Sequence, residues 1–162
     1  MEMKVLNDIQ LTEKFWLSEF ACDDQVDIDM RLVKELQKLR DFIGKPINIT
    51  SGYRTPERNK RIGGSSKSKH MEGIAADIYV DGMSTEELYY IVKHFNFNGI
   101  GIYNYHVHVD VREKKAFWDE RTLKTNMVSV FKWFNVWMII YITFSNKRLK
   151  TQMRGSKLEL LD

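Results

Sequence analysis

The sequence predicts an α+β fold in which a small antiparallel sheet carries flanking helices. Three observations predict it: one long segment has apolar residues at helical spacing, several short segments are β-branched or alternating, and loops rich in glycine and serine separate them. With 162 residues, 43% hydrophobic and 29% charged, the chain can bury a core without disulfides. Its single cysteine, Cys22, leaves histidine and carboxylates as the ligands for any metal.

The first predicted elements lie in residues 11–50. An apolar cluster in residues 11–21 predicts a short helix or lid that packs on the core. A helix is predicted over residues 29–43, because apolar residues recur there every three or four positions and Gly44 and Pro46 end the pattern. Residues 47–50 are alternating and β-branched, which predicts a strand.

The second half of the predicted domain alternates between loop, strand and helix. Residues 63–68 are a loop by composition. Ser84 and Glu87 have the spacing of a capping box, so a helix is predicted from there to about His94. Three further strands are predicted over residues 75–80, 99–103 and 106–111.

The basic charge of the chain belongs to its C-terminal part. Residues 1–120 hold 17 Lys+Arg and 20 Asp+Glu, a net of −3, and residues 121–162 hold the remaining 8 and 2, a net of +6. Before residue 120 only the short stretch 54–69 is basic, so no nucleic-acid partner is expected. The change in composition predicts a domain over residues 1–120 and an apolar, basic tail over residues 121–162.

Residues 127–144 of the tail contain few polar side chains and are followed by basic ones. A membrane span needs about 20 apolar residues, so this segment is borderline. Three hypotheses stay open: a membrane anchor with a cytoplasmic C-terminus, a helix that lies on a membrane or docks on the domain, and a buried strand or unselected extension.

Histidines and aspartates gather in two of the predicted strands. His70 ends a loop, and Asp77 follows seven residues later inside a strand. In the second strand His106, His108 and Asp110 alternate with valines, so all three project from one face. If the two strands are neighbours, His70, Asp77 and one histidine of the second strand can meet as a mixed N/N/O ligand set. Three protein ligands with an open fourth position are typical of catalytic zinc.

A plainer interpretation is that these histidines face solvent on a half-buried sheet and that Asp77 caps a turn. Three of the four histidines of the chain fall in the two segments, which favours the metal site. The fourth, His94, ends a predicted helix, where a cation suits the helix dipole, and is interpreted as structural.

Four motifs occur in order along residues 51–112: Ser51-Gly52-Tyr53-Arg54, Ser68-x-His70-x-x-Gly73-x-Ala75-x-Asp77, Gly99-Ile100-Gly101-Ile102-Tyr103 and His108-Val109-Asp110-Val111-Arg112. They resemble the zinc D-alanyl-D-alanine carboxypeptidase family, in the branch that includes phage endolysin peptidases. The resemblance covers about residues 11–118 and implies a hedgehog/D-Ala-D-Ala-peptidase-like zinc domain. It further implies one Zn²⁺ per chain and hydrolysis of an amide bond in peptidoglycan stem peptides, by a carboxypeptidase or an endopeptidase.

Within this resemblance His70, Asp77 and His108 match the zinc ligands of the family. Arg54 matches an arginine that sits beside the metal and steadies the developing negative charge of the substrate, a role that suits the fixed donors of a guanidinium.

The resemblance does not specify the general base. His106 ranks first, because some members of the family carry a histidine at its position. Asp110 ranks second, with the alternative role of orienting a ligand imidazole, and Glu72 on the ligand loop ranks third.

The first 15 residues have neither the basic nor the apolar region of a secretory signal. The expectation is therefore a protein made in the cytoplasm of a bacterium or by a phage, which acts on the cell wall after release or export. Two other hypotheses stay open: a wall-binding module that keeps the zinc but has lost turnover, and a membrane-tethered adaptor that works through its tail.

Overall fold

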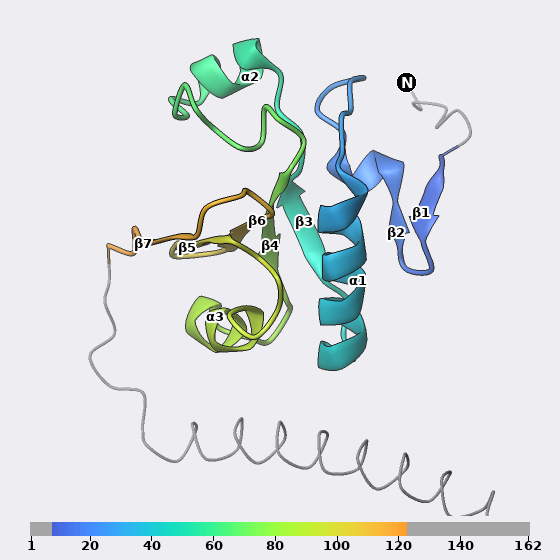
Figure 1. Ribbon diagram of the computed structural model, residues 1–162, viewed down its shortest axis with the longest axis vertical. Helices are drawn as coiled ribbons and strands as arrows, with labels where there is room; N and C mark the ends of the chain where they lie inside the picture. The colour runs from blue at the N-terminus through green and yellow to red at the C-terminus, as the bar shows by residue number, and fades with distance from the viewer. Residues whose placement is uncertain (1–7, 123–162) are drawn as a thin grey trace, which may run out of the picture. The chain divides into compact units, whose positions relative to one another are not determined.

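The computed structural model describes residues 8–122 (Figure 1). The predicted tail, apart from residues 121 and 122, lies outside the described residues together with its segment 127–144, so the boundary at residue 120 and the membrane hypotheses stay predictions. Within residues 8–122, none of the helices has the length and apolar character needed to cross a membrane.

The N-terminal cluster forms a hairpin followed by one helical turn. Strand β1 (Gln10–Thr12) pairs antiparallel with β2 (Phe15–Trp16), and the 3₁₀ helix η1 (Leu17–Phe20) follows. Phe15 and Phe20 are fully buried in the core. The predicted helix is therefore limited to η1, because hydrogen bonds such as Leu17 N–H to Ile9 O (2.8 Å) tie this segment to the chain before it.

Helix α1 (Met30–Ile43) begins and ends where its sequence predicts. The carboxylate of Asp29 accepts a hydrogen bond from the Arg31 N–H, and Gly44 ends the helix in the left-handed region, at φ 69°. Its apolar stripe is completely buried and consists of Leu32, Val33, Leu36 and Leu39.

A five-stranded sheet forms the centre of the fold, in the order β3-β4-β6-β5-β7. Its strands are β3 (Asn48–Ser51), β4 (Ala75–Tyr79), β5 (Gly99–Ile102), β6 (Val107–Asp110) and β7 (Ala116–Asp119). The first four pair antiparallel, as predicted. Strand β7 was not predicted from the sequence; it pairs parallel with β5 and makes the sheet mixed.

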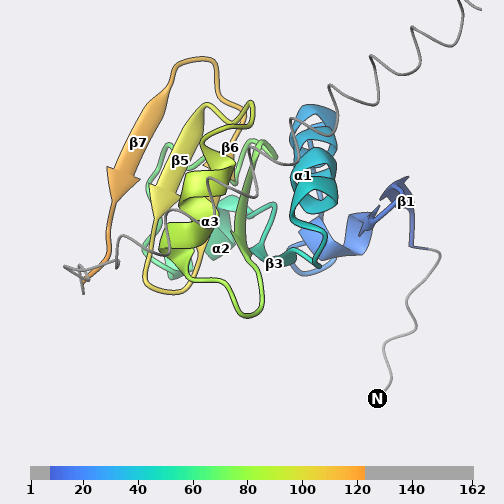
Figure 2. The same cartoon turned by 90° about the horizontal axis from the view of Figure 1, so that it is seen from below.

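Two further helices flank the sheet. Helix α3 (Thr85–Val92) begins at the predicted capping box of Ser84 and Glu87 and lies over β5 and β6 (Figure 2). Side chains of α1 and α3 share one core with the apolar residues of β4 and β6. The short helix α2 (Pro56–Arg61) was not predicted, although Thr55 at its N-cap and proline at its first position are typical of a helix start.

Candidate metal centre

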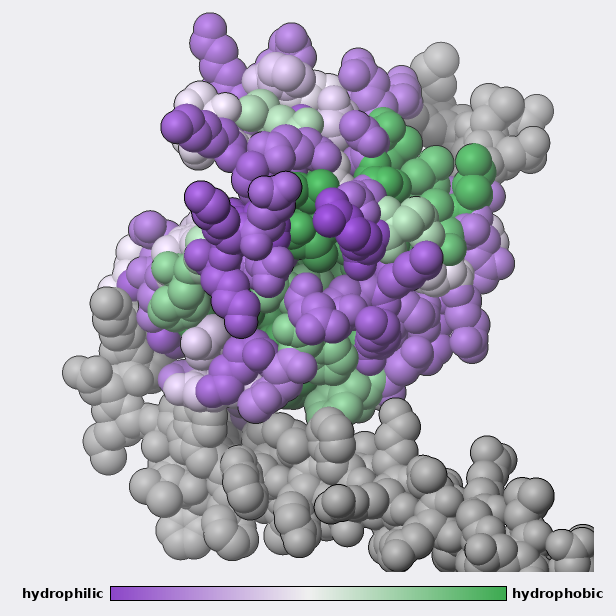
Figure 3. All heavy atoms as spheres, viewed as in Figure 1, coloured by the Kyte–Doolittle hydropathy of each residue, from purple (hydrophilic) through white to green (hydrophobic). Residues whose placement is uncertain are grey.

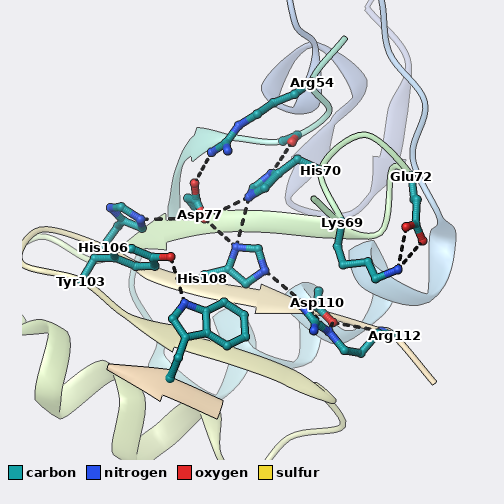
Figure 4. Close-up of polar contacts among 12 residues, drawn as sticks. Arg54, Lys69, His70, Glu72, Asp77, Tyr103, His106, His108, Asp110 and Arg112 are labelled. Atoms are coloured by element: carbon teal, nitrogen blue, oxygen red, sulfur yellow. Dashed lines mark hydrogen bonds and ion pairs between the residues drawn. The ribbon is translucent and has the colours of Figure 1, made fainter. Parts of the chain in front are cut away.

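Three side chains from separate segments converge on the face of the sheet opposite the apolar core. Asp77 on β4 lies directly across from His108 on β6, and opposed residues of antiparallel strands point to the same side. His70 reaches them from the loop that precedes β4 (Figure 4). All three side chains are buried. The structure thus brings together His70, Asp77 and His108.

The ligand atoms of these residues lie within hydrogen-bond distance of one another. His70 Nε2 is 3.1 Å from His108 Nδ1 and 3.2 Å from Asp77 Oδ1, and His108 Nδ1 is 2.9 Å from Asp77 Oδ1. Three ligands bound to one tetrahedral zinc at about 2.0–2.1 Å are about 3.3 Å apart. The observed spacing is close to that value, so the group can hold one metal ion.

The remaining ring nitrogens of the two histidines show why a cation fits. His70 Nδ1 lies 2.7 Å from the Gly52 carbonyl oxygen, and His108 Nε2 lies 3.1 Å from Asp110 Oδ2. If each of these nitrogens donates its hydrogen, the lone pairs of His70 Nε2 and His108 Nδ1 face the Asp77 carboxylate. Three acceptors that face one another require a cation between them.

The electrostatics of the cluster favour positive charge. Burial raises the pKa of Asp77, but hydrogen bonds with His108 and His70 outweigh it and hold the pKa well below its usual value. Burial lowers the pKa of His108, yet Asp110 and Asp77 raise it above its usual value overall. Without a metal, a proton on His108 can therefore supply the positive charge for which the two carboxylates are arranged.

Arg54 borders the cluster and contacts one of its candidate ligands. Its guanidinium pairs with Asp77 Oδ2, and its Nε donates to Ser51 Oγ at 2.7 Å. The pairing occupies the second carboxylate oxygen of Asp77 and leaves Oδ1 for the histidines. The Arg54 backbone N–H also donates to the His70 carbonyl, at 3.1 Å, so arginine and ligand loop are fixed together.

His106 lies on the partly exposed side of the cluster, just before β6. Its Nε2 is 3.9 Å from Asp77 Oδ1, and 28% of its side chain is exposed. The ring stacks on Tyr103, with centroids 4.5 Å apart. Burial lowers the pKa of His106, which keeps its imidazole neutral at pH 7.

Two residues that were not predicted from the sequence, Tyr103 and Trp118, support His106. The Tyr103 hydroxyl accepts a hydrogen bond from Trp118 Nε1 (2.9 Å), so β7 holds the tyrosine that stacks on the histidine. The indole also packs against His108, with centroids 5.1 Å apart. A signal was present in Gly101: a Cβ there would lie 2.4 Å from the indole, so only glycine leaves the space.

The two other candidate bases do not reach the open side of the cluster. Asp110 lies against His108 Nε2, which is the far side of that ring from Asp77, and it is fully buried and paired with Arg112. Glu72 is exposed and pairs with Lys69 at 2.6 Å (Figure 4). Of the three candidates, only His106 therefore borders both the ligands and solvent.

Comparison with known proteins shows the family to which the chain belongs. Residues 6–111 match the family described as Peptidase M15. The chain belongs to the peptidase M15 family. The resemblance predicted from the four motifs is thereby confirmed, while the narrower likeness to phage endolysins stays a prediction.

Two curated relatives show what the chain is similar to. It is 29% identical over 92 residues to the peptidoglycan L,D-endopeptidase MepK of Escherichia coli K12. These aligned residues cover 51% of this chain and 50% of that protein. It is 44% identical over 45 residues to the zinc D-Ala-D-Ala carboxypeptidase of Streptomyces albus G, 27% of this chain and 18% of that protein. The chain spans at most about half the length of these relatives.

Proposed function

We propose that the chain is a zinc peptidase that hydrolyses an amide bond in the stem peptides of bacterial peptidoglycan. The observation that carries the proposal is the buried cluster of His70, Asp77 and His108, whose ligand atoms lie 2.9–3.2 Å from one another while a separate acceptor lies at the outer nitrogen of each imidazole. Family membership supports peptidase chemistry. The names of the two relatives support zinc and peptidoglycan.

When bound, Zn²⁺ polarises a carbonyl group and lowers the pKa of a water molecule to about 7. His70, Asp77 and His108 are the residues that would hold it. The Gly52 carbonyl and Asp110 each hydrogen-bond the outer nitrogen of one ligand imidazole, which fixes the orientation of both rings.

His106 takes the role of general base. Its neutral imidazole accepts the proton of the attacking water and returns it to the leaving amine. Arg54 is placed to steady negative charge on the substrate oxygen, since its guanidinium already lies beside the ligand Asp77. Tyr103 is a positioning residue, because it holds the ring of His106 by stacking and is itself held by Trp118.

The place of His106 also favours an enzyme over a wall-binding module without turnover. A zinc-binding module needs ligands but no proton acceptor beside them. Here a neutral, partly exposed imidazole adjoins the candidate ligands and stacks on Tyr103, which Trp118 holds in place.

Digestion of defined muropeptides by the full chain tests the proposal. Purified protein is incubated with them, with and without a chelator, and the products are identified by mass. We expect cleavage that stops with the chelator and returns with Zn²⁺. Loss of one terminal alanine identifies a carboxypeptidase, and two internal fragments identify an endopeptidase. Cleavage that the chelator does not change contradicts the zinc mechanism. A zinc-loaded protein that cleaves nothing contradicts the proposal that the chain is a peptidase.

A further inference from the structure

The positive charge of residues 1–120 is concentrated in one segment next to the metal centre. This segment, which we call the basic arm, is residues 54–69. It contains six Lys+Arg and one acidic residue, Glu57, whereas the rest of residues 1–120 contains 11 Lys+Arg and 19 Asp+Glu. The basic arm therefore carries a net charge of +5 next to the metal centre, whereas the rest of residues 1–120 carries a net charge of −8.

The basic arm is fixed to the metal centre at both of its ends. It begins at Arg54, which pairs with a metal ligand, and it leads directly into His70, which is one. The hydrogen bond from Arg54 N–H to the His70 carbonyl closes its base. Inside the arm, the buried Asn59 donates through Nδ2 to the Ser65 carbonyl at 2.9 Å and so ties α2 to the returning loop. The arm stands apart from the sheet (Figure 1).

Four of the six positive charges of the arm form no ion pair inside the described part of the chain. Arg54 pairs with Asp77, and Lys69 pairs with Glu72. The other four cations are exposed and form no ion pair within residues 8–122; they are Arg58, Lys60, Arg61 and Lys67. In the space-filling view hydrophilic side chains cover the region of α2 (Figure 3).

We propose that the basic arm is a docking surface for the free carboxylates of peptidoglycan peptide chains. This inference rests on the proposed function. A surface of one charge sign attracts polymers of the opposite sign, and whatever binds the arm is held beside the metal ligands that its two ends supply. Peptide carboxylates are the acidic groups of the polymer that contains the scissile bond. Nucleic acid fits less well, because the arm contains no aromatic residue on which a base could stack.

A binding measurement with two matched variants tests the arm. The arm variant is R58Q/K60Q/R61Q/K67Q, and the control, K34Q/K45Q/K93Q/K115Q, removes four exposed positive charges elsewhere in the described residues. Each full-length protein is sedimented in the cold with purified peptidoglycan that hydrofluoric acid has freed of phosphate-linked polymers. At about 0.05 M salt we expect the arm variant to bind about tenfold more weakly than the wild type and the control to bind within twofold. At about 0.3 M salt the difference should largely disappear.

Kinetics supply a second measurement. If the arm only docks the polymer, its variant raises KM on peptidoglycan about tenfold and leaves kcat unchanged, because none of the four side chains belongs to the metal centre. Sedimentation needs no turnover. A wild-type protein that binds but cleaves nothing therefore contradicts the proposed function. The comparison of binding between the arm and control variants still tests whether the arm is a docking surface.

Three results overturn the docking proposal. The first is equal loss of binding in the arm and control variants, which means that only net charge matters. The second is undiminished binding after the peptide carboxylates have been amidated. The third is binding that the hydrofluoric acid treatment removes, which assigns the arm to phosphate polymers of the wall. Loss of binding on amidation, together with loss in the arm variant alone, supports the proposal.

Discussion

The two faces of strands β4 and β6 are buried to similar depths for opposite reasons. Alternate residues along each strand point to one face or the other. One face is apolar and packs beneath α1 and α3; it comprises Ala76, Ile78, Val107 and Val109. The other face comprises Asp77, His108 and Asp110, which are buried as well.

Burial stabilises the first face and costs free energy on the second. Apolar burial contributes roughly 25 cal/mol per Å². A buried charge must recover its lost hydration from partners, and here each carboxylate has its own: Arg54 beside Asp77, and Arg112 beside Asp110. The fold and the chemistry of the site are therefore supported from different sides of the same strands and can be disturbed separately.

The largest expected effect follows from removing a ligand on the polar face. In H108Q the proposed zinc site loses one candidate ligand, while Asp77 keeps Arg54 and Asp110 keeps Arg112, so no buried carboxylate is left alone. We expect kcat/KM to fall roughly a thousandfold or more, about 4 kcal/mol, and the zinc content to fall well below one per chain. Metal analysis and muropeptide cleavage measure both. A variant with one zinc and full turnover would show that His108 is not a ligand.

The counterpart on the apolar face is Ile78, the neighbour of Asp77. It is fully buried in the core, and I78A removes side-chain volume without touching the ligands. We expect the free energy of unfolding to fall by about 2–5 kcal/mol. At a temperature where the variant is folded, kcat/KM and zinc content should stay at the wild-type values. Denaturant unfolding and metal analysis measure these quantities, and a loss of zinc equal to that of H108Q would contradict the independence of the two faces.

Asp110 distinguishes a positioning residue from a base. In D110N the carboxamide oxygen can still accept the His108 N–H, but the negative charge and the ion pair with Arg112 are lost. We expect zinc affinity to fall about 10- to 100-fold, as measured by competition with a chelator. With saturating zinc most of the activity should return. If activity stays lost at full zinc occupancy, Asp110 rather than His106 is the base.

Local patterns were sufficient to predict most of the fold. Helix α1 was predicted from apolar spacing and its glycine stop, and α3 from its capping box. Strand β6 was predicted from alternation of valines with polar residues. Strand β7 was missed, because its four residues Ala116–Asp119 include no β-branched side chain and it joins the sheet only through its parallel pairing with β5.

The same limit applies to the candidate site. The motifs located the candidate ligands His70, Asp77 and His108, which the structure brings together. The support of His106 was not predicted, because glycine at position 101 becomes an informative signal only once the parallel register places Trp118 opposite it. No spacing in the sequence relates Trp118 to Tyr103; only the folded sheet does.

A smaller effect is expected where β7 supports the site. Y103F keeps the ring that stacks on His106 but removes the hydroxyl that accepts the Trp118 N–H. The cost of one hydrogen bond is about 1 kcal/mol, so kcat should fall about three- to tenfold while KM stays unchanged. The control is Y105F, since Tyr105 is 87% exposed and should tolerate the change. Equal kinetics for the two variants would show that the hydroxyl does not position His106.

The smallest expected effect concerns the start of α1, the helix that covers the apolar face. Asp29 caps this helix, and the Arg31 guanidinium beside it holds the pKa of Asp29 below its usual value of 3.8. D29A should lower the free energy of unfolding by about 1 kcal/mol at pH 7, and D29N by less, because asparagine caps nearly as well. Neither should change kcat/KM or zinc content.

The pH dependence of this small effect separates the cap from its charge. Because the pKa of Asp29 is lower in the folded than in the unfolded chain, its ionic contribution is fully present above the unfolded value of about 3.8. The contribution is lost as the pH falls through the folded-state pKa. The difference between wild type and D29N, measured by denaturant unfolding, should therefore shrink as the pH falls below about 3.8. A difference that grows as the pH falls would mean that the ionised Asp29 carboxylate destabilises the folded chain. The ion pair with Arg31 would then make no contribution to the free energy of unfolding.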